Sequence, residues 1–167
     1  RLLLDNYIGL VKLTNLREVD PEKAKEQLQV AFATSDRNLK KIVHQYPDEI
    51  YYRAEYIEVL QHNYGPRQAL DTLYYLLTPQ QQNKPFLLGY AANMEAESGN
   101  YKVALLKADL LAANFKDKQS PKPYVVYGDI YFIMKKYKKA DKFIQQALKL
   151  DPGNIDAQRL ENKIEKA

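Results

Sequence analysis

The sequence contains no cysteine and no tryptophan, and it has little glycine or proline. Among its 167 residues there are 6 glycines and 8 prolines. The absence of cysteine excludes disulfides, thiolate metal sites and a cysteine nucleophile within this chain. No stretch of about 18 consecutive apolar residues occurs, so no segment has the pattern of a membrane-spanning helix.

Signatures of common catalytic sites are also missing. The sequence has no G-x-x-x-x-G-K-[ST] loop, no G-x-G-x-x-G loop and no H-E-x-x-H pair. Its two histidines, His44 and His62, fall near predicted helix ends and lack metal-ligand spacing. Neighbouring carboxylates such as Glu95 and Glu97 are typical of a solvated helix face. We therefore expect no enzymatic activity, no cofactor and no metal site.

The hydrophobic pattern predicts helices throughout. The chain is 46% hydrophobic and 28% charged, as in folded domains. Apolar residues recur every three or four positions, and strict alternation is absent. Breaks at proline, glycine and asparagine then define about 9–10 helices. The predicted helices span residues 2–17, 22–34, 37–46, 48–62, 66–77, 85–98, 101–114, 121–134, 137–149 and 154–166. The break at residues 35–36 is open, because 22–46 could form one long helix.

Helix pairs repeat along the chain. Tyr101 and Ala104 align with Tyr137 and Ala140 at an offset of 36 residues, and Ala69 aligns with Ala104 at an offset of 35. A single pair of this size cannot bury its own apolar face. Stacked neighbours must then supply the core, which predicts an all-α solenoid of antiparallel helix pairs.

Residues 121–154 resemble a tetratricopeptide (TPR) repeat, a 34-residue helix-turn-helix. The residues that carry this resemblance are Tyr124, Tyr127, Gly128, Tyr131, Ala140, Ile144, Ala147 and Pro152. Five of them match the family's usual residue, and the tyrosines at 124 and 127 and the isoleucine at 144 are substitutions of similar character. Small residues fit where two helices approach closely, and the larger ones fill the gaps between them.

The resemblance implies one continuous right-handed α-solenoid. We expect residues 1–49 to be a helical extension or degenerate unit, 50–84 a TPR-like repeat, and 85–120 a TPR-like repeat with a short insertion. Residues 121–154 are then the best-matched repeat, and 155–167 a polar capping helix.

TPR arrays usually bind peptides in a concave groove lined by the first helix of each repeat. The resemblance therefore implies a non-catalytic protein-interaction scaffold, a module of a larger assembly, secretion or chaperone-like protein. The groove positions of the family fall on Tyr51, Ala54, Glu58, Gln61, Phe86, Gly89, Asn93, Glu97, Lys122, Val125, Asp129 and Phe132. Asn93 is of particular interest because its amide could bond a partner's backbone through both donor and acceptor.

The charges at these positions indicate the kind of partner. Glu58, Glu97 and Asp129 make the predicted groove acidic to neutral. The Lys/Arg/Asn arrangement with which chaperone-binding TPR domains grip a terminal carboxylate is not present. We therefore expect a protein or peptide partner of basic or apolar character, and not an acidic C-terminal tail.

A lysine-rich run supports an alternative function. Residues 115–151 carry nine lysines against four aspartates, with KKYKKADK at 135–142. This surface could bind nucleic acid or an anionic membrane. The repeat register instead implies that the run covers the interhelical turn and the outer face of the second helix, and we expect no nucleic-acid binding.

A third hypothesis is that the chain regulates an enzyme domain elsewhere in the same polypeptide. Because the sequence begins at Arg1 within a predicted helix, we expect it to be a piece of a longer protein. Its composition is compatible with either cytoplasm or periplasm.

Overall fold

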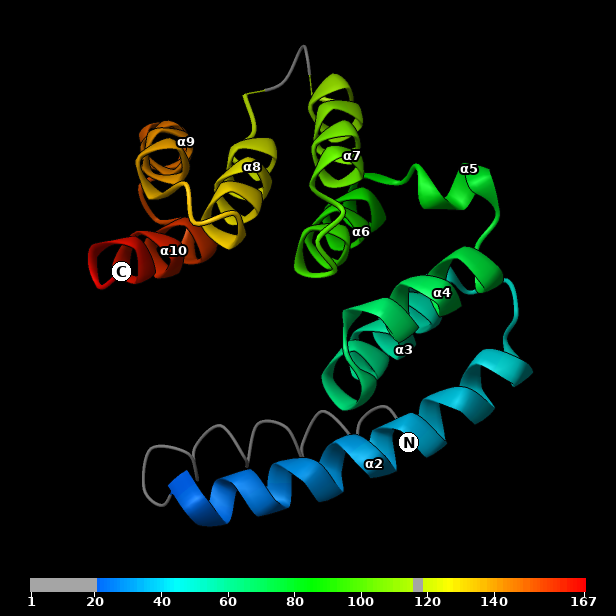
Figure 1. Cartoon of the computed structure of the whole chain (residues 1–167). Coiled ribbons are helices and arrows are strands. Elements are labelled where there is room, and N and C mark those ends of the chain that lie inside the picture. Colours follow the sequence, from blue (N-terminus) through cyan, green and yellow to red (C-terminus); the bar gives the residue numbers. More distant parts are fainter. Residues whose placement is uncertain (1–20, 116–118) are drawn as a thin grey trace. The chain divides into compact units, whose positions relative to one another are not determined.

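The computed structural model describes residues 21–115 and 119–167, and within these ranges the protein is all-α, with nine helices and no strand (Figure 1). The helices are α2 (Pro21–Gln45), α3 (Ile50–Tyr64), α4 (Pro66–Leu76), α5 (Pro79–Gln82), α6 (Pro85–Glu97), α7 (Tyr101–Ala113), α8 (Lys122–Ile133), α9 (Tyr137–Leu150) and α10 (Ile155–Glu165). The all-α prediction is confirmed. The helix predicted over residues 2–17 lies outside the described residues. The described residues form two compact units, which divide between Leu77 and Thr78.

In the first unit, α3 packs against both α2 and α4. Leu39 and Ile42 of α2 are buried against Val59 of α3. The ring of His62 stacks on Phe32, with 4.0 Å between the ring centroids. His62 therefore contacts α2 from the last turn of α3.

Helix α2 is continuous, so the predicted break at residues 35–36 is wrong and the single-helix alternative is correct. Ser35 is only 3% exposed, and it continues the buried face formed by Leu39 and Ile42. Asp36 accepts a hydrogen bond from the Tyr64 hydroxyl at 2.7 Å. Packing along one face outweighs the modest local preference of Ser and Asp for helix ends.

The α3–α4 connection is a tight turn. Gly65 has φ +90°, and Pro66 follows as the first residue of α4. These residue types suit the positions, because glycine tolerates positive φ and proline suits the first helical turn. Arg53 of α3 donates a 2.6 Å hydrogen bond from Nη1 to the Leu76 carbonyl. It thereby satisfies a carbonyl at the end of α4.

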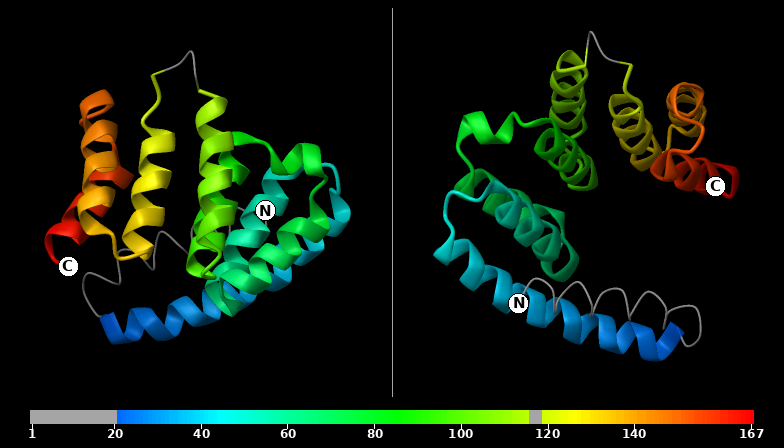
Figure 2. Two further views of the ribbon diagram at one scale, coloured as in Figure 1. Left: turned by 45° about the horizontal axis from the view of Figure 1, so that its top comes forward. Right: turned by 180° about the vertical axis from the view of Figure 1, so that it is seen from behind.

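The second unit contains two helix pairs and a final helix. Helix α6 pairs with α7 and α8 with α9, while α8 also contacts α6 and α7 (Figure 2). Ala92 and Ala96 of α6 share one core with Ala104 and Ala108 of α7. These small side chains allow the helices to approach closely. Helix α10 packs on α9 and α8.

Within each pair, an equivalent turn connects the first helix to the second. Gly99 has φ +84° in the α6–α7 turn, and Lys135 has φ +58° in the α8–α9 turn, 36 residues later. A lysine in this conformation costs about 1 kcal/mol. The prediction that Glu95 lies on a solvated helix face is wrong, because its side chain is only 5% exposed. Its Oε2 accepts a 2.8 Å hydrogen bond from Asn100 Nδ2, so this buried carboxyl helps to hold the α6–α7 turn.

The short helix α5 was not predicted. It begins with a capping box, in which Thr78 Oγ1 accepts from the Gln81 backbone N–H and the Gln81 side chain accepts from the Thr78 N–H. None of the helices in the described ranges combines the length and apolarity needed to cross a membrane.

Candidate functional site

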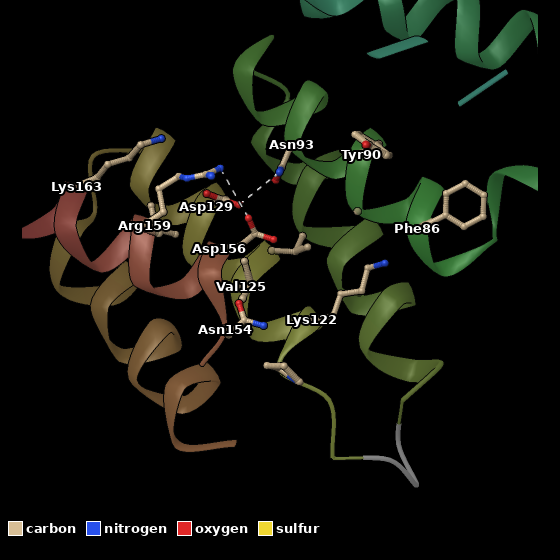
Figure 3. A pocket seen from close by; sticks show the side chains of 14 residues that line it. Phe86, Tyr90, Asn93, Lys122, Val125, Asp129, Asn154, Asp156, Arg159 and Lys163 are labelled. Atoms are coloured by element: carbon tan, nitrogen blue, oxygen red, sulfur yellow. Dashed lines mark hydrogen bonds and ion pairs between the residues drawn. The ribbon is translucent and has the colours of Figure 1, made fainter. Parts of the chain in front are cut away.

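A groove of about 600 Å³ opens between α6, α8 and α10 in the second unit. Side chains from all three helices point towards it (Figure 3). Nine of the lining residues fall into three rows, each with one residue from every helix. The first row is Phe86, Lys122 and Asp156, the second is Gly89, Val125 and Arg159, and the third is Asn93, Asp129 and Lys163. In every row the step is 36 residues from α6 to α8 and 34 from α8 to α10.

Half of the residues predicted for the groove line it. They are Phe86, Gly89, Asn93, Lys122, Val125 and Asp129. Glu97 does not line it, and lies exposed at the end of α6. Phe132 packs instead against the buried core around Ile144, with its ring centroid 5.4 Å from that of Tyr137.

The other four predicted residues belong to α3 of the first unit. Tyr51 is 65% exposed and Glu58 is also exposed, whereas Ala54 is buried and Gln61 is half-buried. For these four, a role in binding stays a prediction.

Sequence reasoning missed the third wall of the groove, which is α10. Asp156, Arg159 and Lys163 all line it. The repeat spacing could have found them, because Asp156, Arg159 and Lys163 lie 34 residues after the groove positions Lys122, Val125 and Asp129. Two of them are cations, so the lining is more basic than the acidic-to-neutral groove expected from α6 and α8.

The third row places three polar side chains, Asn93, Asp129 and Lys163, across the three helices. Asn93 Nδ2 donates a 3.4 Å hydrogen bond to Asp129 Oδ2. Among the described residues, no partner donates to the buried Oδ1 of Asn93. Burial raises the pKa of Asp129 from 3.8 to about 6, and the charges of Asp156 and Glu97 add to the rise. The Asn93 bond and the Lys163 charge oppose it.

In the first row, Lys122 is a half-buried cation. Burial lowers the pKa of its ammonium group. No residue in the described part of the chain forms an ion pair with it. Its side chain passes close to Gly89, since a Cβ at that glycine would lie 4.0 Å from Lys122 Cε. The groove therefore holds a partly desolvated positive charge that no described residue pairs with.

On the α10 wall, Arg159 Nη1 lies 3.9 Å from Asp156 Oδ1. The two side chains are 66% and 74% exposed. A solvated pair of this kind contributes little to stability, typically below about 1 kcal/mol.

The raised pKa of Asp129 predicts a pH-dependent stability. Between about pH 4 and pH 6 the folded state retains a proton on Asp129 that the unfolded chain has lost, so the fold loses stability as the pH rises through this window. Asp129→Asn should remove that loss and stabilise the protein at pH 7 by about 1–2 kcal/mol, which is less than the full shift implies because the group is half-buried.

Urea unfolding followed by circular dichroism at pH 4, 5, 6 and 7 measures this difference between variant and wild type. Glu165→Gln, at an exposed position near the end of α10, is the control and should follow the wild-type profile. Equal pH dependence in Asp129→Asn and wild type would contradict the assignment.

Comparison with known families identifies one segment of the chain. The model of the tetratricopeptide repeat matches residues 121–154. Residues 121–154 are a TPR repeat. The match has the same boundaries as the sequence prediction, which is confirmed. Comparisons with curated proteins and with solved structures found no match.

The TPR repeat comprises α8 and α9, and it supplies the central wall of the groove. Most of the residues that predicted it are buried. Gly128, Tyr131, Ala140, Ile144 and Ala147 are buried, Tyr124 and Tyr127 are half-buried, and Pro152 lies in the exposed closing turn. The Tyr127 hydroxyl donates to the Asp109 carboxylate, and its ring stacks on Phe143 with 4.9 Å between centroids. The repeat is thus tied to α7, which precedes it.

The lysine run occupies the turn and outer surface of the TPR repeat. Lys135 and Lys136 lie in the α8–α9 turn, and Lys138 and Lys142 are exposed on α9. The Lys139 ammonium lies 4.3 Å from the centre of the Tyr131 ring, a cation–π contact. None of these lysines lines the groove.

Proposed function

We propose that this chain is a non-catalytic protein-interaction module that holds a segment of a partner protein in the groove between α6, α8 and α10. A TPR repeat is a protein-interaction unit, and here it supplies the groove's central wall. The observation that carries the proposal is the alignment of nine side chains in three rows across consecutive helices. We further propose that the module serves a larger assembly, secretion or chaperone-like protein.

The groove offers several kinds of contact to a peptide. Phe86 and Val125 provide apolar side chains at the groove. Asn93 can turn its amide towards a peptide backbone, because among the described residues its side chain has one hydrogen bond, the long one to Asp129. The half-buried carboxylate of Asp129 favours a basic group at its own position in the groove.

Photo-crosslinking from within the groove tests this function. Phe86 is replaced by p-benzoylphenylalanine, which conserves an aromatic side chain, and Tyr101 on α7, outside the groove, is replaced likewise as the matched control. We expect the variant at position 86 to crosslink to one discrete partner, and the variant at position 101 not to crosslink to that partner. Mass spectrometry of the adduct then identifies the bound segment.

Substitutions decide between the groove and the lysine-rich surface. Asn93→Ala and Asp129→Ala should each reduce partner binding about tenfold, the effect of losing one hydrogen bond to a charged or polar group. Combined replacement of Lys138, Lys139 and Lys142 by glutamine should leave it unchanged. The reverse outcome would contradict the proposal and favour the alternative of an anionic partner on the outer surface.

A further inference from the structure

Two opposite charges lie on the groove face of α8. Lys122 and Asp129 both line the groove and are seven residues apart, which is two helical turns. At 1.5 Å rise per residue they are separated by about 10 Å along the helix axis. Both side chains are half-buried. The groove face of α8 therefore carries a positive charge at the beginning of the helix and a negative charge two turns later.

Neither charge is well compensated within the protein. Lys122 forms no ion pair with the residues that the structure describes. Asp129 has a 3.4 Å hydrogen bond from Asn93 and the charge of the exposed Lys163. A bound segment would displace water from both groups, and an incompletely paired charge becomes costly when it is desolvated. A ligand that brings the opposite charges to both positions avoids that cost.

An apolar residue lies between these two charges on α8. Val125 stands between Lys122 and Asp129 in the sequence of α8, and it shares the second row with Gly89. The third member of that row, Arg159, is on α10 and is paired with Asp156. A small or apolar ligand side chain fits this central position.

We propose that the partner segment carries an acidic side chain for Lys122 and a basic side chain for Asp129, about 10 Å apart, with a small or apolar residue between them. This inference rests on the proposed function. In an extended segment the two charges are three residues apart, because a polyproline II chain rises about 3.1 Å per residue and returns to the same face every third residue. In a helix they are seven residues apart. The order of the charges fixes the direction in which the segment binds.

The other charges around the groove select for this mixed pattern. Besides Lys163, Asp129 is approached by the charges of Glu97 from α6 and Asp156 from α10. A polybasic segment would meet Lys122, Arg159 and Lys163 together, whereas a polyacidic tail would meet Asp129 and Asp156. Either uniform charge meets a like charge on α8, at Lys122 or at Asp129, whereas the mixed pattern meets an opposite charge on α8 at both positions.

A random 12-residue peptide library, displayed on phage and selected on the full chain, tests the inference. Selected peptides that crosslink from the Phe86 position are those that bind in the groove. We expect them to share an acidic and a basic residue at a fixed spacing and in one order. Lys122→Glu should weaken their binding about tenfold or more, the scale of a lost charge-assisted hydrogen bond. Exchanging the peptide's acidic residue for lysine should restore it.

Asp129→Lys should behave in the same way when the peptide's basic residue is exchanged for glutamate. The milder variants Lys122→Gln and Asp129→Asn cover the case in which a charge reversal does not fold, as judged by circular dichroism. Lys142→Glu, exposed on the outer face of α9, is the control for charge alone.

The outcomes separate the two proposals. Peptides that crosslink from the Phe86 position but lack the charge pair, or whose binding is not restored by charge exchange, would overturn this inference and leave the proposed function intact. Failure to select any peptide that reaches the groove would overturn both.

Discussion

Replacing Ile144 by alanine is expected to lower the free energy of unfolding by about 2–5 kcal/mol. Ile144 has no exposed surface, and it forms a core with Ala147, Ala157 and Leu160. The substitution removes apolar area and leaves a cavity between α8, α9 and α10 that neighbouring side chains cannot close without moving. The wall of the groove formed by α10 depends on this core, so the variant should also weaken the packing of α10.

Urea unfolding measured by circular dichroism gives the global change, and hydrogen exchange of the α9 and α10 amides shows where it occurs. Gln146→Ala, exposed on α9 two residues away, is the matched control and should change stability by less than about 0.5 kcal/mol. An Ile144→Ala variant as stable as this control would mean that the helix register is wrong.

Replacing Gly128 by valine is expected to destabilise the protein by about 3 kcal/mol, at the upper end of the range for overpacking a core. A Cβ at this glycine would lie 2.6 Å from Cδ1 and 2.9 Å from Cγ1 of Ile144, and 3.3 Å from Cδ2 of Leu160. Valine adds two further methyl groups. Alanine should cost less, because its methyl meets the end of a side chain and it gains up to about 1 kcal/mol of helix propensity.

Two comparisons isolate the steric cause, and the same urea experiment measures both. Gly89→Ala places a Cβ at 3.6 Å from Val126 Cγ2, which is an ordinary contact, so this helical glycine should instead gain about 0.5–1 kcal/mol. In the double variant Gly128→Ala with Ile144→Ala, the new methyl enters the space that Ile144 vacates. The double variant should be more stable than the sum of the single effects by at least about 0.5 kcal/mol. Strict additivity would show that the two positions do not touch.

Close packing explains why the TPR repeat could be predicted from sequence. Gly128, Ala140 and Ala147 are small because two helices and a third neighbour meet at these positions, and Ile144 is large because it fills the space between them. Such constraints leave a fixed pattern in the chain. The continuity of α2 left no such pattern, since Ser35 is buried by tertiary packing that its local sequence does not reveal.

The groove could be predicted only in part, for a related reason. Row positions on α6 and α8 followed from the repeat register, and six of those residues line the groove. Helix α10 has the polar composition of a capping helix, which obscured the fact that Arg159 and Lys163 occupy the same row positions. The partial desolvation of Lys122 and Asp129 could not be predicted at all, because burial depends on how three helices converge.

The three rows also have a mechanical consequence. In an array of helical repeats, stability is approximately the sum of each unit's own stability and its contacts with its neighbours. A segment lying along the groove would touch α6, α8 and α10 at once. It would therefore add contacts across both the α6–α8 interface and the α8–α10 interface. Ligand occupancy would then make the helices of the second unit unfold more nearly as one body, and the same linkage would make a stiffer array bind its ligand more tightly.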